Sequence, residues 1–170
     1  MLSVTQFSEG GNKPQCLEEK AGDEHVIESG SFEGARGDFL FFDTALEGDG
    51  EQFDVFTNTG EKILEDLCVS MDGISAKLIP PMAQSTPEIR NDTGIELRYD
   101  RVYVAQCSFG DDHHNCWTNA MKETGLKEAF SPECSTATVI TFGVRVVLHT
   151  NPVSQQGTIV SKIKSCYAGE

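Results

Sequence analysis

The sequence lacks any long apolar run and has little positive charge. No stretch approaches the ~20 consecutive apolar residues that span a bilayer, so we expect no membrane insertion. Residues 1–11 have neither the basic start nor the apolar centre of a signal peptide, and none is predicted. The chain has 13 Lys and Arg residues against 27 Asp and Glu residues, and the basic residues form no cluster that could contact phosphates. We therefore expect no nucleic-acid binding.

Motifs of common enzyme classes are also missing. The chain has no G-x-S-x-G elbow, no H-E-x-x-H motif and no phosphate-binding P-loop. His25 and His149 lie at the ends of predicted strands, where a histidine can act as a general base but is more often structural. No nucleophile is marked beside either histidine. The motif content favours a non-enzymatic protein that needs no cofactor.

The acidic residues are unevenly distributed. Residues 1–60 hold 13 acids and three bases, a net charge of −10, whereas residues 135–169 hold three bases and no acid. A surface divided in this way suits contact with a cationic partner or with the basic end of a second copy. The alternative is that the acids only keep the protein in solution.

The cysteines are spread along the chain, and none lies in a C-x-x-C pair. An even number at wide spacing is typical of long-loop disulfides rather than of a zinc ribbon or a redox dithiol. Many pairings are possible, so the connectivity stays open. Since a terminal strand frays unless it is tied down, we expect Cys166 to be bridged across about 50 residues or more. Disulfides are predicted for all six cysteines, Cys16, Cys68, Cys107, Cys116, Cys134 and Cys166.

Short apolar runs bounded by Gly, Asp, Asn or Pro predict β-strands through most of the chain. In one of them Val144 and Val146 flank Arg145, so the two valines are expected to face the core. In the strand before it, the apolar alternation shifts near Asp100–Arg101, which predicts a β-bulge. The predicted strands are 25–33, 38–44, 52–57, 74–79, 94–107, 137–149 and 157–167.

The remaining segments complete a mainly-β prediction. Apolar residues recur on one face at 60–71 and at 116–130, which predicts two helices. Residues 151–157 link the last two strands as a hairpin, and residues 1–24 are expected to form a polar arm. We expect one domain over 25–170, a two-layer antiparallel β-sandwich of Greek-key or jelly-roll type with one or two short helices.

The segment from Cys107 to Cys116 is the densest cluster of metal-binding residue types. Imidazole and thiolate groups are the usual zinc donors, so the segment is a candidate transition-metal site. Its predicted ligands are Asp111, His113 and His114, with either cysteine as a further donor. The alternative is a disulfide between the two cysteines that closes a polar loop, and the absence of a standard ligand spacing favours it.

A second acidic segment, residues 43–54, is a candidate calcium site because it offers oxygen ligands beside flexible glycines. It lacks the EF-hand spacing of acids and glycine, and the alternative is a solvated acidic loop. The predicted calcium ligands are Asp43, Asp49, Glu51 and Asp54.

Two short motifs bear on contacts outside the cell. Arg36-Gly37-Asp38 has the sequence of an integrin-binding tripeptide, although Asp38 directly precedes an apolar run and is expected to open a buried strand. Asn91 begins an N-glycosylation sequon, which is used only along a eukaryotic secretory route.

The leading hypothesis is a non-enzymatic, secreted or surface β-sandwich that acts by protein–protein contact, as a binding module or an assembly subunit. It rests on the missing catalytic motifs, the cysteine pattern and the divided charge. The expected location is extracellular or on a particle surface. Two alternatives stay open: a virion or filament structural protein whose arm, 1–24, reaches a neighbour, and a metal-assisted hydrolase centred on 107–116.

Overall fold

The computed structural model describes residues 30–44, 48–80, 93–110 and 113–169. Within these ranges the chain forms eight β-strands, one α-helix and two short 3₁₀ turns. The strands are β1 (Ser31–Arg36), β2 (Phe39–Asp43), β3 (Glu51–Thr57), β4 (Lys62–Cys68), β5 (Ser75–Ile79), β6 (Gly94–Val104), β7 (Val139–Thr150) and β8 (Val153–Tyr167). The helix is α1 (His113–Thr124), and the turns are η1 (Met71–Gly73) and η2 (Pro132–Cys134).

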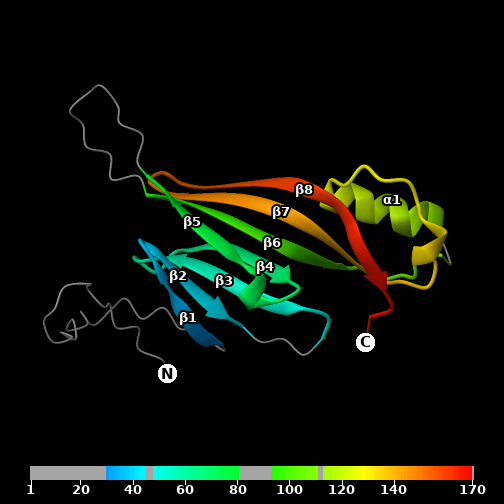
Figure 1. Cartoon of the computed structure of the whole chain (residues 1–170), viewed down its shortest axis with the longest axis horizontal. Helices are drawn as coiled ribbons and strands as arrows, with labels where there is room; N and C mark the ends of the chain where they lie inside the picture. Colours follow the sequence, from blue (N-terminus) through cyan, green and yellow to red (C-terminus); the bar gives the residue numbers. More distant parts are fainter. Residues whose placement is uncertain (1–29, 45–47, 81–92, 111–112, 170) are drawn as a thin grey trace, which may run out of the picture.

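These eight strands belong to one antiparallel sheet with the order β1-β2-β3-β4-β6-β7-β8, and β5 also pairs with β6. A single residue pair, Cys68 opposite Arg101, links β4 to β6. The sheet therefore has two parts, with β1–β3 below β6–β8 in Figure 1. The predicted mainly-β, antiparallel class is confirmed. Neighbours in the sheet follow the chain order except at one place, where β4 pairs with β6 and β5 lies on the other side of that contact, paired with β6 alone.

The core lies between the two parts of the sheet. One buried cluster contains side chains of β2, β3 and β4 together with side chains of β6 and β7, as a two-layer packing requires. Phe53 of β3 and Tyr99 of β6 meet edge to face across the core, with ring centroids 5.1 Å apart. Near one end of β8, α1 adds Trp117 to the cluster, packed between the rings of Phe109 and Phe130 (Figure 1).

The predicted strands are confirmed with shifted ends, and the range 25–33 overlaps β1 only from Ser31. The terminal hairpin is also confirmed, but its turn is shorter than 151–157 because β8 already begins at Val153. The polar arm predicted at 1–24 lies outside the described residues. The strands that form the core are thus the segments in which apolar and polar residues alternate with period 2.

The predicted alternation in β7 is confirmed. Val144 and Val146 are 2% and 0% exposed and belong to the core cluster. Arg145 between them lies on the opposite face, where its guanidinium is paired with Glu96. Because successive strand residues point to opposite faces, one charged residue was enough to orient the whole strand.

The predicted bulge near Asp100–Arg101 is wrong, because β6 keeps one register with β7 along its whole length. Arg101 occupies the same face as Tyr99, which belongs to the core cluster. It is tolerated there because its Nε donates a hydrogen bond to Asp66 Oδ2 at 2.7 Å, within an ion pair. A partly buried ion pair, and not an inserted residue, interrupts the apolar alternation. On the other side of β7, its pairing with β8 does shift register, around Phe142.

The helix predicted at 60–71 is wrong, since this region forms β4 and η1. β4 pairs with β3 along its length, and Ile63 and Leu64 enter the core from the strand. Pairing across the sheet outweighs a helical period carried by a few residues. The helix predicted at 116–130 exists as α1, but it ends just before Gly125, whose φ of +79° forms the left-handed C-terminal cap that glycine favours.

The described residues contain two disulfides, Cys107–Cys116 and Cys134–Cys166, with sequence separations of 9 and 32. Cys166 is bridged as predicted, but its partner lies nearer than about 50 residues because η2 packs against β8. Cys16 lies outside the described residues. The short disulfide is the loop-closing alternative considered for residues 107–116.

The disulfide predicted for Cys68 is wrong, because Cys68 carries a free and buried thiol. The pairing of β3 with β4 places it in the core, where its Sγ donates a hydrogen bond to the carbonyl oxygen of Glu51 at 3.3 Å. Burial raises the pKa of the thiol to about 12. A neutral, enclosed thiol is chemically inert, so Cys68 serves as a small apolar residue of the core.

Candidate functional site

The outer face of β6 and β7 carries a cluster of charged side chains. Arg98 and Arg145 lie directly opposite each other on the two strands, an arrangement that repels. Glu96 offsets this repulsion: it accepts hydrogen bonds from Nε of Arg98 and Nε of Arg145, both at 2.8 Å, and from Nη2 of Arg145 at 2.5 Å. The two guanidinium groups lower the pKa of Glu96 to about 2, so its carboxylate stays ionised in ordinary buffers.

A hollow of about 490 Å³ opens on this face beside Arg98. Gly143 of β7 lines it and has no side chain to fill it, while the Gly143 N–H is satisfied by Ser161 Oγ at 2.7 Å. We call this the Gly143 hollow. Its lining residues are Val69, Ser70, Gly73, Arg98, Tyr99, Asp100, Gly143, Val144, Val160, Ser161 and Lys164.

The charges of the Gly143 hollow are two cations and one acid. The side chains of Arg98 and Lys164 are 59% and 50% exposed. Lys164 Nζ donates to both carboxylate oxygens of Asp100, at 2.6 and 2.9 Å. A guanidinium carries five N–H donors and an ammonium three, so both cations keep donors for a further acceptor. The hollow therefore has the chemistry of an anion-binding site.

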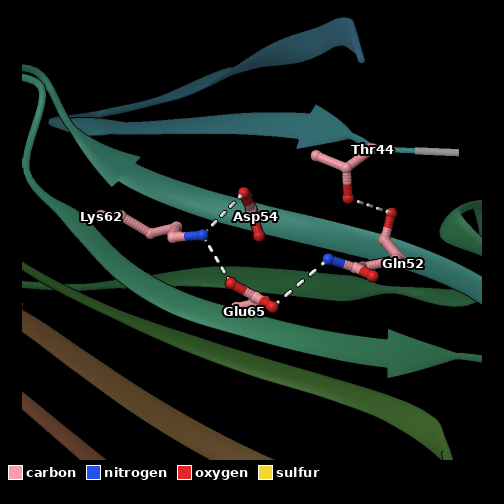
Figure 2. A network of polar contacts seen from close by, with 5 residues as sticks. All are labelled: Thr44, Gln52, Asp54, Lys62 and Glu65. Carbon is pink, nitrogen blue, oxygen red and sulfur yellow. Dashed lines mark hydrogen bonds and ion pairs between the residues drawn. The ribbon is translucent and has the colours of Figure 1, made fainter. Parts of the chain in front are cut away.

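A second polar network lies on the outer face of β1–β4 (Figure 2). Lys62 Nζ lies 3.3 Å from Asp54 Oδ2 and 2.5 Å from Glu65 Oε2. Gln52 Nε2 donates to Glu65 Oε1 at 3.4 Å, and Thr44 Oγ1 donates to the carbonyl oxygen of Gln52 at 3.2 Å. The network connects β3 and β4 with the residue that follows β2, on the side away from the core.

Asp54 is the buried member of this network. It lies between two core residues of β3 and faces the other way, opposite Phe42 of β2. The ring of Phe42 packs against those of Phe32 and Phe56, so the surroundings of Asp54 are largely apolar. Within the described part of the chain, Asp54 Oδ1 is buried without a hydrogen-bond partner. Burial raises the pKa of Asp54 against the opposing effect of Lys62.

We expect Asp54→Asn to raise the melting temperature at pH 7. Since the folded-state pKa of Asp54 is raised, its stabilising contribution is full below the ordinary value of 3.8 and is lost as the pH rises through the folded-state pKa. Removing a half-satisfied buried carboxylate is worth about 1 kcal/mol at pH 7, or roughly 2–4 °C for a chain of this size. Thermal unfolding at pH 7 and pH 3 measures the effect, which should vanish at pH 3.

Glu65→Gln is the control, because the Glu65 side chain is exposed and pairs with the same lysine. It should change the melting temperature by less than about 1 °C. A lower melting temperature for Asp54→Asn at pH 7 would show that the ion pair with Lys62 outweighs the cost of burial.

The four predicted calcium ligands do not form a ligand cluster. No group of three or more His, Cys, Asp or Glu side chains suited to a metal occurs in residues 30–44, 48–80, 93–110 and 113–169. Asp54 is paired with Lys62, and the carboxylate of Glu51 accepts a hydrogen bond from the Met71 N–H. Asp43 ends β2, and Asp49 lies in the bend before β3. The strand pairing that separates these acids is not visible in their sequence spacing.

The predicted transition-metal segment contains the short disulfide. Cys107 and Cys116 are bonded to each other, so neither supplies the thiolate considered as a further ligand. Asp111 lies outside the described residues. His113 and His114 form the start of α1, and their side chains also lie outside the described part of the structure. The disulfide removes both sulfur donors considered for this segment, and the ligand set of Asp111, His113 and His114 stays a prediction.

One partly buried ionic cluster has no counterpart in the sequence analysis. Asp66 accepts hydrogen bonds from the Tyr99 hydroxyl and from Arg101. Burial and the neighbouring carboxylate raise the pKa of Tyr99 far above its ordinary value. The three side chains come from β4 and β6, 33 and 35 residues apart in sequence. The break in apolar alternation at Arg101 was the one available signal.

Of the two short motifs, the tripeptide lies in the described part of the structure and the glycosylation sequon does not. Arg36 ends β1, and Gly37 and Asp38 form the turn to β2, so Asp38 precedes the strand instead of opening it. Gly37 has a φ of +59°, as this two-residue turn requires, and Asp38 Oδ1 accepts a hydrogen bond from Asn58 Nδ2 at 3.0 Å. Asn91 lies outside the described residues.

Comparison of the chain with protein-family models, with curated proteins and with solved structures finds no match. Among the described residues, no helix has the length and apolar character to cross a membrane.

Proposed function

We propose that the protein is a non-enzymatic assembly subunit that acts by protein–protein contact, through the free edge of β8. The single observation that carries the proposal is the position of β8 at one end of the strand order, with no strand of the described residues on its outer side. β8 is also the longest of the described strands, with 15 residues. A free edge presents unpaired N–H and C=O groups to a further strand.

The open part of this edge is residues 153–158, all of which are exposed. Farther along β8, the N–H of Ile163 already donates to Glu128 Oε1 at 2.8 Å, so that part of the strand has a side-chain contact of its own. Residues 153–158 contain none of the lysines or prolines that protect natural edge strands.

A second copy is the partner that this segment suits best. Residues 153–158 carry no charge, so two copies can pair there without like-charge repulsion although each chain has a net charge of −14. Antiparallel pairing of two β8 strands about a twofold axis gives a closed dimer, the commonest symmetry of protein assemblies. The two disulfides support an oxidising location, such as the extracellular space or a particle surface.

Proline substitutions in β8 test the proposal. In an antiparallel strand, adjacent residues direct their N–H groups to opposite sides, so one of Gln155 and Gln156 points its N–H toward β7 and the other outward. We expect the wild-type protein to dimerise in sedimentation equilibrium over the micromolar to millimolar range. One of Gln155→Pro and Gln156→Pro should keep the melting temperature within about 2 °C and lose dimerisation, because proline removes only an outward N–H there.

The other proline variant is the matched control, since it breaks a hydrogen bond to β7 and should lower the melting temperature as well. Because the contact segment is uncharged, the dimer should persist in 0.5 M salt, where the Debye length is only about 4 Å. A wild-type protein that stays monomeric at every concentration, or dimerisation that both proline variants retain, would contradict the proposal.

A further inference from the structure

We infer that the Gly143 hollow binds carboxylates, and that its ligand is the acidic segment 17–28 of a second copy of the chain. The inference deepens the proposed function and rests on it, because it gives the same self-association a second contact. The edge contact is uncharged, whereas this one is electrostatic, so the two contacts can be tested separately.

The geometry of the hollow suits an extended acidic segment. Arg98 of β6 and Lys164 of β8 both line the hollow, and β7 with the bare backbone of Gly143 lies between their strands. Val69 and Val160, each about half exposed, supply apolar walls for the aliphatic part of a glutamate side chain. Ser70 adds a hydroxyl that is not used to cap η1. A carboxylate placed over Gly143 therefore meets donors from β6 and β8, on either side of β7, and from Ser70.

The local charge differs from that of the whole protein. The hollow and the adjoining arginine contribute three cations, Arg98, Arg145 and Lys164, against two acids, Glu96 and Asp100. The chain as a whole has 14 more acids than bases. Both local acids are already paired, so an incoming carboxylate meets an excess of one positive charge here and repulsion elsewhere. This contrast directs an acidic segment to the hollow.

The acidic segment 17–28 is the occupant to which the sequence points. It holds five acids and one lysine, a net charge of −4, within twelve residues. Residues 135–169, which supply β7 and β8, contain no acid that would compete with it. Every copy of the protein carries both the segment and the hollow in equal number, which makes a second copy a stoichiometric partner.

A synthetic peptide of residues 17–30 is the probe, and fluorescence anisotropy in 0.01 M salt is the measurement. The protein used is the proline variant of β8 that no longer dimerises, so that edge pairing does not contribute. We expect the peptide to bind, and the double variant Arg98→Gln/Lys164→Gln to weaken binding about tenfold, as the loss of two solvent-exposed ion pairs allows. A peptide with Glu18, Glu19, Asp23 and Glu24 changed to amides should not bind.

The matched control is Lys77→Gln/Lys122→Gln, which removes the same charge from exposed positions on β5 and α1. It should weaken peptide binding less than twofold, roughly the effect of screened distant charges. Equal weakening by both double variants would show a long-range field instead of a site. Unchanged binding in the hollow variant, or no binding of the wild-type peptide sequence, would overturn the inference.

Light scattering of the full chain completes the test. We expect larger species in 0.01 M than in 0.5 M salt, because screening shortens the Debye length from about 30 Å to about 4 Å. The difference should disappear when Glu18, Glu19, Asp23 and Glu24 are neutralised, while the edge dimer remains. A salt-independent dimer with no peptide binding would retain the proposed function and overturn only this inference. Peptide binding by a protein that never dimerises through β8 would support this inference and overturn the proposed function.

Discussion

Val146→Asp is expected to abolish folding. Val146 lies at the centre of β7, has no exposed surface and belongs to the core cluster shared by both parts of the sheet. An unpaired carboxylate in such a position costs several kcal/mol, comparable to the roughly 5–15 kcal/mol that separates a folded domain from its unfolded chain. The measurements are the yield of soluble protein and the presence of a cooperative thermal transition.

A milder pair of variants keeps this prediction testable if the aspartate variant cannot be purified. Val146→Thr leaves a hydroxyl in the core and should lower the free energy of unfolding by roughly 1–3 kcal/mol. Val147→Thr changes the neighbouring residue, which faces outward opposite Glu96, and should lie within about 0.5 kcal/mol of wild type. Equal effects at the two positions, or a soluble and cooperative Val146→Asp, would mean that the assigned faces of β7 are inverted.

Removing the Cys134–Cys166 disulfide should cause the second largest loss of stability. The bond closes a loop with a sequence separation of 32 and ties the end of β8 to η2. On the chain-entropy model, such a loop contributes roughly 4 kcal/mol by restricting the unfolded chain. For the double variant Cys134→Ser/Cys166→Ser we expect the melting temperature in oxidising buffer to fall by roughly 10 °C. Changing both cysteines avoids a stray thiol.

The Cys107–Cys116 disulfide provides the comparison. Its sequence separation is 9, so the same model gives it roughly 2.5 kcal/mol, and Cys107→Ser/Cys116→Ser should have the smaller effect. Reductant should lower the wild-type melting temperature and leave the variant that lacks all four of these cysteines unchanged. A larger loss from the short loop than from the long one would show that strain or local packing, and not loop length, governs these bonds.

Much of the fold follows from local pattern. Strands with clear alternation, such as β6 and β7, were predicted because each residue's face depends only on its parity along the strand. The terminal hairpin and a helix near α1 were also predicted, since turn residues and apolar runs signal them locally. The helix expected at 60–71 failed for the opposite reason, because β3 was available to pair with that segment.

The candidate sites were harder to predict from the sequence than the fold. The acids at 43–54 are close in sequence but do not form one ligand cluster. Strand pairing places Asp54 beside Lys62, and Glu51 accepts a hydrogen bond from the Met71 N–H. The Gly143 hollow, in contrast, joins Arg98 and Lys164, which nothing in the sequence connects. Sites built from β-strands combine residues that are distant along the chain, so neither their presence nor their absence is visible as a local motif.

The chain's own residue pattern was sufficient for the class of fold, the faces of the central strands and the uneven charge, because each of these depends on composition or on neighbours along the chain. The three-dimensional arrangement alone decided which cysteines pair, that Arg101 is neutralised by Asp66, and that β8 ends the sheet. Those features depend on the register between strands, which is fixed by core packing over the whole domain and not by any single segment.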